Sequence, residues 1–361
     1  GTSVDVTQHN HRETMSGEQP ILSLGLAGFA PQQVARLTAL LSQLPEGLPA
    51  WQVVAPFAEA DAWWVNGSGV HLLPDGTLMV PGGRVSEPPL QLSLADVDRP
   101  IAFSTPLASS DFEPMYTFDM ASEASVREAL QQFEHWLRPV RAQFSLAALI
   151  NERERSLQAG VYHVAFRDTL LAVVDMQAWQ VGYLPTASAL DFERAHWHKR
   201  PPSANDIPHQ FVRASLTQIM WNYAQRTTRN VLPERYRSEL IYFRRAPRVP
   251  LRVLKDSQLM LLRELAQAPA KFQTLVLQTG LGEAQLARDL ASLYFAGSIT
   301  STRSHAAASP RLPEFGGDGG LPSDLSSGLS PSPIGADSGF TGRVDPLRDQ
   351  DFTVSAPLRP N

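Results

Sequence analysis

Short apolar segments alternate with amphipathic ones between Pro20 and about Leu137. Two segments, 31–44 and 125–137, repeat their apolar residues at the spacing of an amphipathic helix. Five others are typical of buried strands: ILSLGLAG, WQVVAPF, ADAWWV, RPIAFSTP and MYTFDM. Strands that alternate with helices favour a parallel sheet, and Pro74-Asp75-Gly76 adds a hairpin. The pattern predicts a disordered leader over residues 1–19 and an α/β domain with a parallel sheet flanked by helices over residues 20–140.

The pattern changes at about residue 141. Residues 144–158 predict a linking helix, and VYHVAF, TLLAVVD and AWQVGYL predict an antiparallel meander because only short polar breaks separate them. The polar passage 193–208 predicts an exposed loop. A long amphipathic helix is then expected from its apolar positions Phe211, Val212, Leu216, Ile219, Met220 and Tyr223. We expect an α+β middle domain over residues 141–250.

Three helical segments follow in a row, and SITSTR after them is typical of a strand. The helical segments are DSQLMLLRELAQ, FQTLVLQT and GEAQLARDLASLYFAG. Three helices followed by a strand predict a winged helix over residues 251–304. From residue 305 to 361 Ser, Pro, Gly and Asp dominate, and this composition predicts a disordered tail.

Composition excludes several classes of site. The 361 residues include no cysteine, which excludes disulfides, thiol nucleophiles and cysteine-ligated zinc. The net charge of -5 disfavours a chain that coats nucleic acid through its overall field. No apolar run has the length of a membrane helix, and the first residues lack the pattern of a signal peptide, so we expect a cytoplasmic protein without membrane insertion.

No enzymatic motif is found in the sequence. A Walker loop, a G-x-S-x-G elbow and H-E-x-x-H are missing, and GLAG after the first strand is too short for a dinucleotide fingerprint. We therefore expect no catalytic residues and no cofactor.

The first domain resembles a response-regulator receiver in its strand order. A working receiver needs two acidic residues after its first strand to hold Mg²⁺, whereas this chain has Gly25-Leu26-Ala27-Gly28. The resemblance places Asn66 at the phosphoacceptor position, and an amide cannot form an acyl phosphate. It places Ser104 and Thr105 at the hydroxyl position and Asp119 at the position of the usual lysine. It implies a degenerate receiver that cannot be phosphorylated.

The stretch from Ser145 to Arg303 resembles the PatA-type regulatory modules found beside receivers. The resemblance rests on the order of helix, short helix, Gly turn and helix that ends in LYFAGSI. It implies a signalling or protein-interaction unit, with partners whose identity the sequence does not give.

The outer face of the third helical segment, GEAQLARDLASLYFAG, decides whether that helix could contact DNA. Leu286, Leu290, Leu293 and Tyr294 are the expected core positions. The residues expected to face outward are Glu283, Gln285, Arg288, Asp289 and Ser292. Two acids and one base on this face would repel phosphates, so DNA is a less favoured partner than protein.

Arginines are concentrated between residues 226 and 252. Their guanidinium groups bind phosphate or carboxylate through two hydrogen bonds, so an anionic ligand such as a nucleotide is one interpretation. A solvated face is the other, because the chain has 28 Arg against 3 Lys. The candidate ligand-binding residues are Arg237, Arg244, Arg245, Arg248 and Arg252.

Histidines form one weak candidate for a metal site. His196 and His198 would share one face of a strand, and His209 from a nearby loop would add a third ligand. The charged and Pro-rich flanks indicate an exposed loop instead, so we expect no metal.

These observations favour a non-catalytic bacterial signalling adaptor that acts through protein contacts and is gated by an anionic ligand at the arginine-rich segment. A DNA-binding transcriptional regulator is the first alternative. A nucleotide-sensing module, for example for a cyclic dinucleotide, or an orphan enzyme is the second.

Overall fold

The structure is a computed structural model that describes residues 17–55, 58–96 and 98–308. The described chain divides into two compact units, which we call unit 1 (up to Arg141) and unit 2 (from Ala142). Most of the expected leader, and the expected tail from residue 309 on, lie outside the described residues.

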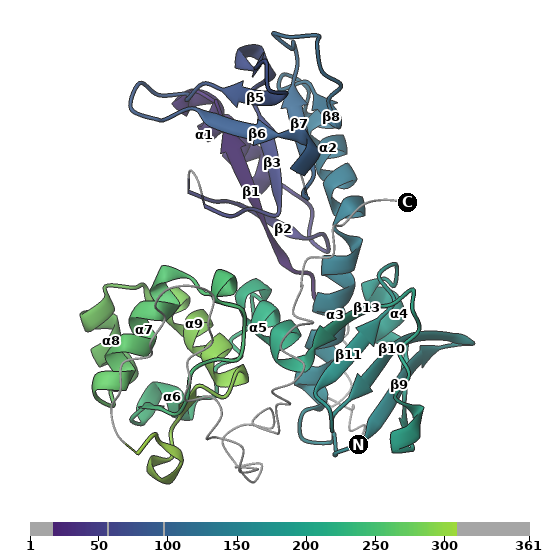
Figure 1. The fold of residues 1–361 in the computed structure, drawn as a ribbon, viewed down its shortest axis with the longest axis vertical. Helices are drawn as coiled ribbons and strands as arrows, with labels where there is room; N and C mark the ends of the chain where they lie inside the picture. Colours follow the sequence, from purple (N-terminus) through teal and green to yellow (C-terminus); the bar gives the residue numbers. More distant parts are fainter. Residues whose placement is uncertain (1–16, 56–57, 97, 309–361) are drawn as a thin grey trace, which may run out of the picture. The chain divides into compact units, whose positions relative to one another are not determined.

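A five-stranded parallel sheet forms the centre of unit 1, as the sequence predicts (Figure 1). The order across the sheet is β2-β1-β3-β7-β8. Its strands are β1 (Ile21–Ala27), β2 (Ala50–Val53), β3 (Ala62–Val65), β7 (Ile101–Ser104) and β8 (Tyr116–Phe118). This order places the carboxyl ends of β1 and β3 side by side at the point where the chain reverses direction across the sheet.

Two helices cover one face of this sheet, and both were predicted from their periodicity. In α1 (Pro31–Ser42) the proline occupies the first helical position, where its missing N–H costs nothing. In α2 (Glu123–Trp136) the Ser122 side chain accepts a hydrogen bond from the Ser125 N–H and caps the helix. Their apolar residues form one core with the sheet: Leu22, Leu24, Leu37, Leu41, Trp64, Val126, Leu130 and Phe133.

The opposite face packs against a small antiparallel sheet instead of helices. Its strands are β4 (His71–Leu72), β5 (Thr77–Val80) and β6 (Leu90–Ser93), and the first two form the predicted hairpin. Leu78 and Val80 of this sheet are buried with Val65 and Phe103 of the parallel sheet. The sequence did not reveal β6, because it is only four residues long and follows a Gly- and Pro-rich turn.

Unit 2 begins within α3 (Arg138–Arg153) and contains a five-stranded antiparallel sheet. The order of its strands is β12-β9-β10-β11-β13. The strands are β9 (Val161–Phe166), β10 (Thr169–Asp175), β11 (Gln180–Tyr183), β12 (His196–Arg200) and β13 (Val212–Ser215), and the short helix α4 (Ala189–Glu193) precedes β12. The predicted meander of β9, β10 and β11 is confirmed.

Two predictions about unit 2 were wrong. The passage expected to be an exposed loop contains the edge strand β12. Most side chains of β12 are exposed, so its sequence lacks the alternation of apolar and polar residues that predicts a strand. The expected long helix is shorter, because Val212 belongs to β13 and α5 (Leu216–Arg226) begins only after Ser215. The Ser215 side chain caps α5 by accepting a hydrogen bond from the Gln218 N–H.

The segment expected to form a winged helix contains α7 (Asp256–Gln267), α8 (Phe272–Thr279) and α9 (Glu283–Phe295). The strand after them, β15 (Ile299–Thr300), is short and pairs with β14 (Tyr242–Phe243). Strand β14 and the short helix α6 (Arg235–Ser238) both come before the three helices in the chain. The core of these helices is continuous with the core under the antiparallel sheet. Residue 250, the expected domain boundary, therefore does not separate two cores.

None of the helices in the described ranges combines the length and the apolar character that crossing a membrane requires.

A buried carboxyl group in α2 gives unit 1 a pH dependence. Glu134 is 8% exposed and accepts a hydrogen bond of 3.1 Å from the Trp51 indole N–H. Burial raises the pKa of Glu134, although the Trp51 hydrogen bond and the Arg141 charge act in the opposite direction. The stability that the protonated form contributes is present below the ordinary glutamate pKa and is lost as the pH rises through the raised pKa.

We therefore expect Glu134→Gln, which keeps an acceptor for Trp51 but cannot ionise, to stabilise unit 1 at pH 7 relative to the unmodified protein. The gain should shrink toward about pH 4, where glutamates become protonated in the unfolded chain as well. Urea denaturation at the two pH values measures the difference. Glu128→Gln, at an exposed position of the same helix, is the control. A gain from Glu134→Gln that is the same at both pH values would contradict this account.

Candidate functional site

The carboxyl edge of the parallel sheet is the first candidate site, because ligands of open α/β sheets bind where the strand order reverses. Asn66, Ser104 and Asp119 lie at the carboxyl ends of β3, β7 and β8. The loop after β1, with Gly28, lies at the same edge.

Asn66 holds two loops of this edge together. Its side-chain N–H donates to the Gly28 carbonyl at 2.9 Å. Its side-chain oxygen accepts from the Ser68 N–H at 3.1 Å and from the Ser68 hydroxyl at 2.7 Å, and the Ser104 hydroxyl lies at 3.4 Å. The amide is therefore occupied by contacts within the chain.

The hydroxyl groups at the end of β7 are also engaged. Ser104 is buried, and its Oγ accepts from the Gly67 N–H at 3.0 Å. Gly67 passes so close that a Cβ there would lie 2.1 Å from the Ser104 carbonyl oxygen. Thr105 is exposed, and its hydroxyl donates to the Phe118 carbonyl at 3.3 Å.

Asp119 shapes the turn that leads into α2. Its Oδ1 accepts from the Ala121 N–H at 2.9 Å, and its own N–H donates to the Ser125 hydroxyl at 2.8 Å. Local bonds of this kind are typical of an aspartate in a turn. Within the described ranges no group of three His, Asp or Glu side chains is arranged to hold a metal ion.

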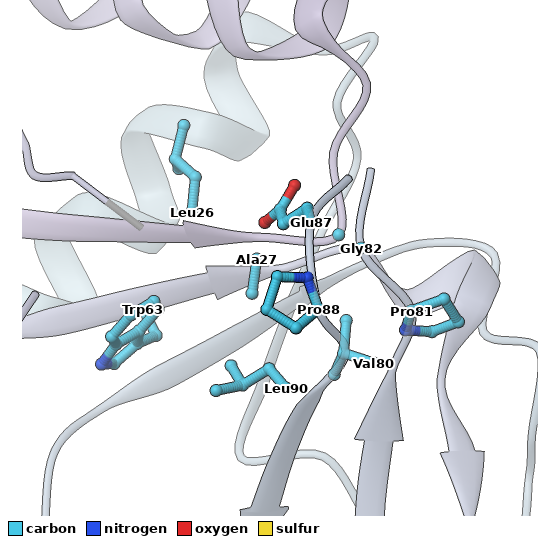
Figure 2. Close-up of a pocket in the computed structure, with 10 residues that line it drawn as sticks. Leu26, Ala27, Trp63, Val80, Pro81, Gly82, Glu87, Pro88 and Leu90 are labelled. Atoms are coloured by element: carbon cyan, nitrogen blue, oxygen red, sulfur yellow. The ribbon is translucent and has the colours of Figure 1, made fainter. Parts of the chain in front are cut away.

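A small pocket lies beside this edge, and no pattern in the sequence predicted it (Figure 2). Its lining is mostly apolar and comes from the end of β1, from β3 and from the segment 80–90. Glu87 is the one charged lining residue, and its Oε2 accepts a hydrogen bond of 3.2 Å from the Gly83 N–H. The lining residues are Leu26, Ala27, Gly28, Trp63, Val80, Pro81, Gly82, Glu87, Pro88 and Leu90.

The second candidate site is the arginine-rich segment of unit 2. The side chain of Arg237 lies over the Phe272 ring at 5.0 Å and donates to the Asn230 side-chain oxygen at 3.3 Å. Arg252 is exposed in a short turn before α7. The ring contact and the hydrogen bond of Arg237 are ordinary packing of an arginine side chain, although its Nε is buried without a hydrogen-bond partner in the described part of the chain.

Arg244, Arg245 and Arg248 are close enough to repel one another. Burial lowers the pKa of Arg245 to about 10, and the charges of Arg244 and Arg248 contribute in the same direction. The Nε of Arg245 is buried and has no hydrogen-bond partner in the described part of the chain. The structure thus brings together three of the five candidate arginines around a guanidinium whose Nε is buried.

The expected outer face of α9 needs a correction. Glu283 is exposed, and Gln285 and Arg288 are half-buried, but Asp289 and Ser292 are fully buried. The prediction that these two residues face outward was wrong because α9 has neighbours on more than one side. The Ser292 hydroxyl, for example, donates to the Trp221 carbonyl of α5 at 3.2 Å.

Asp289 is the centre of a buried polar network that the sequence did not indicate. Its Oδ1 accepts from the side-chain amides of Gln225 (3.3 Å), Gln258 (3.2 Å) and Gln285 (3.0 Å). Gln225 also donates to the Ser292 hydroxyl at 2.8 Å. These bonds connect α5, α7 and α9, so the network holds the three helices together.

The histidines are only partly brought together. His196 and His198 lie in β12 with ring centroids 6.4 Å apart, and His163 is opposite His198 on β9. The Nε2 of His163 is hydrogen-bonded to the Ala204 carbonyl at 2.8 Å. His209 lies in the segment before β13, and among the described residues no hydrogen bond or ring contact joins it to the other three.

We expect Asp289→Ala to lower the free energy of unfolding of unit 2 by about 2–4 kcal/mol, because three amide donors lose their acceptor in a buried place. Glu283→Ala, at an exposed position of the same helix, should change it by less than about 0.5 kcal/mol. Chemical denaturation monitored by circular dichroism compares the two. Equal small effects would show that the network does not hold the helices together.

Comparisons of the chain with models of protein families, with curated protein sequences and with solved structures found no match in any of the three.

Proposed function

We propose that this protein is a cytoplasmic, non-catalytic signalling adaptor whose unit 1 is a receiver-like domain that works without phosphorylation. The observation that carries the proposal is the closed carboxyl edge of the parallel sheet. Asn66, at the position of a phosphoacceptor, donates to Gly28 and accepts from Ser68. At this edge Asn66 therefore joins two loops of the chain, those that contain Gly28 and Ser68.

The strand order supports the receiver-like part of the proposal. The order β2-β1-β3-β7-β8 is that of flavodoxin-like doubly wound folds, to which receivers belong. Unit 1 differs in covering one sheet face with β4, β5 and β6, which lie between β3 and β7 in the chain. The fold alone does not give a function, so the proposal rests on the edge chemistry.

Helices α7, α8 and α9 suit a winged-helix unit that docks proteins better than one that reads DNA. Gly280, in the left-handed conformation, ends α8 and makes the turn into α9. A helix that reads bases needs an exposed face in the major groove. From Leu286 to Phe295, however, Arg288 is the one residue of α9 that is not buried.

The first test is chemical phosphorylation. We expect the intact protein to gain no phosphoryl group after incubation with acetyl phosphate and Mg²⁺, because Asn66 lacks a carboxylate and the loop after β1 has none to hold the metal. Asn66→Asp should also remain unmodified, since it restores the acceptor without the metal ligands. Intact mass spectrometry measures the adduct, with a competent receiver as positive control. A stable adduct on the unmodified protein would overturn the proposal.

The second test addresses the DNA-binding alternative. We expect no sequence-selective shift of duplex DNA in electrophoresis at low or at physiological salt, because from Leu286 to Phe295 all residues of α9 except Arg288 are buried. Weak binding that disappears as the salt is raised would reflect phosphate contacts alone. A selective shift that persists at physiological salt would favour the transcriptional regulator instead.

A further inference from the structure

The guanidinium of Arg245 has an environment that differs from that of an ordinary surface arginine. Its Nε, like that of Arg235, Arg237 and Arg248, is buried and has no hydrogen-bond partner among the described residues. Its nearest charged neighbours, Arg244 and Arg248, have the same sign and disfavour its charge. Burying a cation without an acceptor is costly, and proteins ordinarily offset that cost with an anion.

The backbone fixes the position of Arg245. The N–H groups of Arg244 and Arg245 both point to the Ser298 carbonyl, at 2.8 and 3.4 Å. Gly297, with φ of +68°, follows the C-cap of α9 and directly precedes Ser298. A Cβ at Gly297 would lie 2.6 Å from the Arg245 Nη2, so the glycine leaves the space that the guanidinium occupies. The backbone of Arg245 is therefore held by Ser298, and its guanidinium lies against Gly297.

The end of α9 does not provide the missing acceptors for this cation. The carbonyls of Ser292, Leu293 and Tyr294 accept backbone hydrogen bonds from Ala296, Ser298 and Gly297, and none of them accepts a hydrogen bond from the Arg245 Nε. The helix C-terminus contributes a partial negative charge, but that charge is smaller than one full anion. A second buried polar group lies next to β15, because the hydroxyl oxygen of Ser298, the residue before that strand, is buried without a hydrogen-bond partner among the described residues.

We infer that Arg245, flanked by Arg244 and Arg248, forms a binding site for the phosphoryl group of a small molecule. A phosphoryl group has about -1.5 to -2 charges and three acceptor oxygens, which suits several guanidinium groups together. A single carboxylate has only one charge. The inference deepens the proposed function, because it gives the adaptor a ligand that acts at the arginine-rich segment.

The experiment measures the thermal unfolding of the full chain with pyrophosphate, ATP or a cyclic dinucleotide, against sodium chloride at equal ionic strength. We expect at least one phosphoryl ligand to raise the midpoint by ~5 °C at a hundredfold excess over its Kd. Arg245→Met should lose this response. Arg263→Met, at an exposed arginine of α7, should keep it.

The three ligands distinguish a free phosphate group from a nucleotide. A response to pyrophosphate equal to that with ATP assigns the site to the phosphoryl group alone, and a larger response to ATP or to the dinucleotide adds the nucleoside. No response beyond that to sodium chloride, or an equal response in Arg245→Met, would overturn the inference. A short duplex DNA that binds more tightly than any of these small ligands would also overturn it.

Isothermal titration of the unmodified protein with pyrophosphate gives a direct measurement, in case Arg245→Met does not fold. Saturable binding of one equivalent supports the inference, and its absence contradicts it. These experiments need no protein partner and no phosphorylation, so their failure leaves the adaptor proposal standing. Conversely, a phosphorylated unit 1 would overturn that proposal without affecting this site.

Discussion

The requirement that buried polar groups find hydrogen-bond partners connects the main features of both units. An unmade hydrogen bond in a protein interior costs more than a made one contributes. Asn66 meets the requirement in unit 1 by bonding to Gly28 and Ser68. In unit 2 the Oδ1 of Asp289 meets it through three glutamine amides, whereas the Oδ2 of the same carboxylate is buried without a partner among the described residues. The Nε of Arg245 is one of several buried polar atoms of the described chain that do not meet it, and the like charges of Arg244 and Arg248 beside it are what point to an anionic ligand.

A second constraint explains why unit 1 closes its carboxyl edge. A parallel sheet needs cover on both faces. Here α1 and α2 cover one face, and β4, β5 and β6 cover the other. The segment after β5 passes close to the chain after β1, because a Cβ at Gly83 would lie 1.8 Å from the Phe29 carbonyl oxygen. The cover of the sheet thus occupies space beside the edge where related folds bind their ligands.

The sequence pattern predicted helices with one apolar side and strands that are apolar along most of their length. The helices α1, α2 and α7 have one apolar side, and the strands β1, β9 and β10 are mostly apolar, so each was visible in the sequence. Edge strand β12 was missed because its side chains are mostly exposed. The same limit applies to α9. Asp289 and Ser292 were predicted to be surface positions, because the sequence does not distinguish a polar residue that is hydrogen-bonded inside a core from one that is exposed to water.

The candidate sites were predictable to different degrees. The position of Asn66 at a strand end and the clustering of arginines were both visible in the sequence. The surroundings of Arg245 were not, because they depend on Gly297 and Ser298, which are about fifty residues further along the chain. The Asp289 network depends likewise on Gln225 and Gln258 from two other helices. Contacts between distant segments leave no local pattern.

The claim that a buried, unpartnered arginine marks a ligand site is tested most directly by nuclear magnetic resonance of the arginine Nε–H groups. The isotopically labelled full chain would be titrated with pyrophosphate. Our account predicts a saturable shift of one Nε–H resonance that is missing from the spectrum of Arg245→Met. The account would be contradicted if no arginine Nε–H resonance moved, or if the resonances that moved were all retained in that variant.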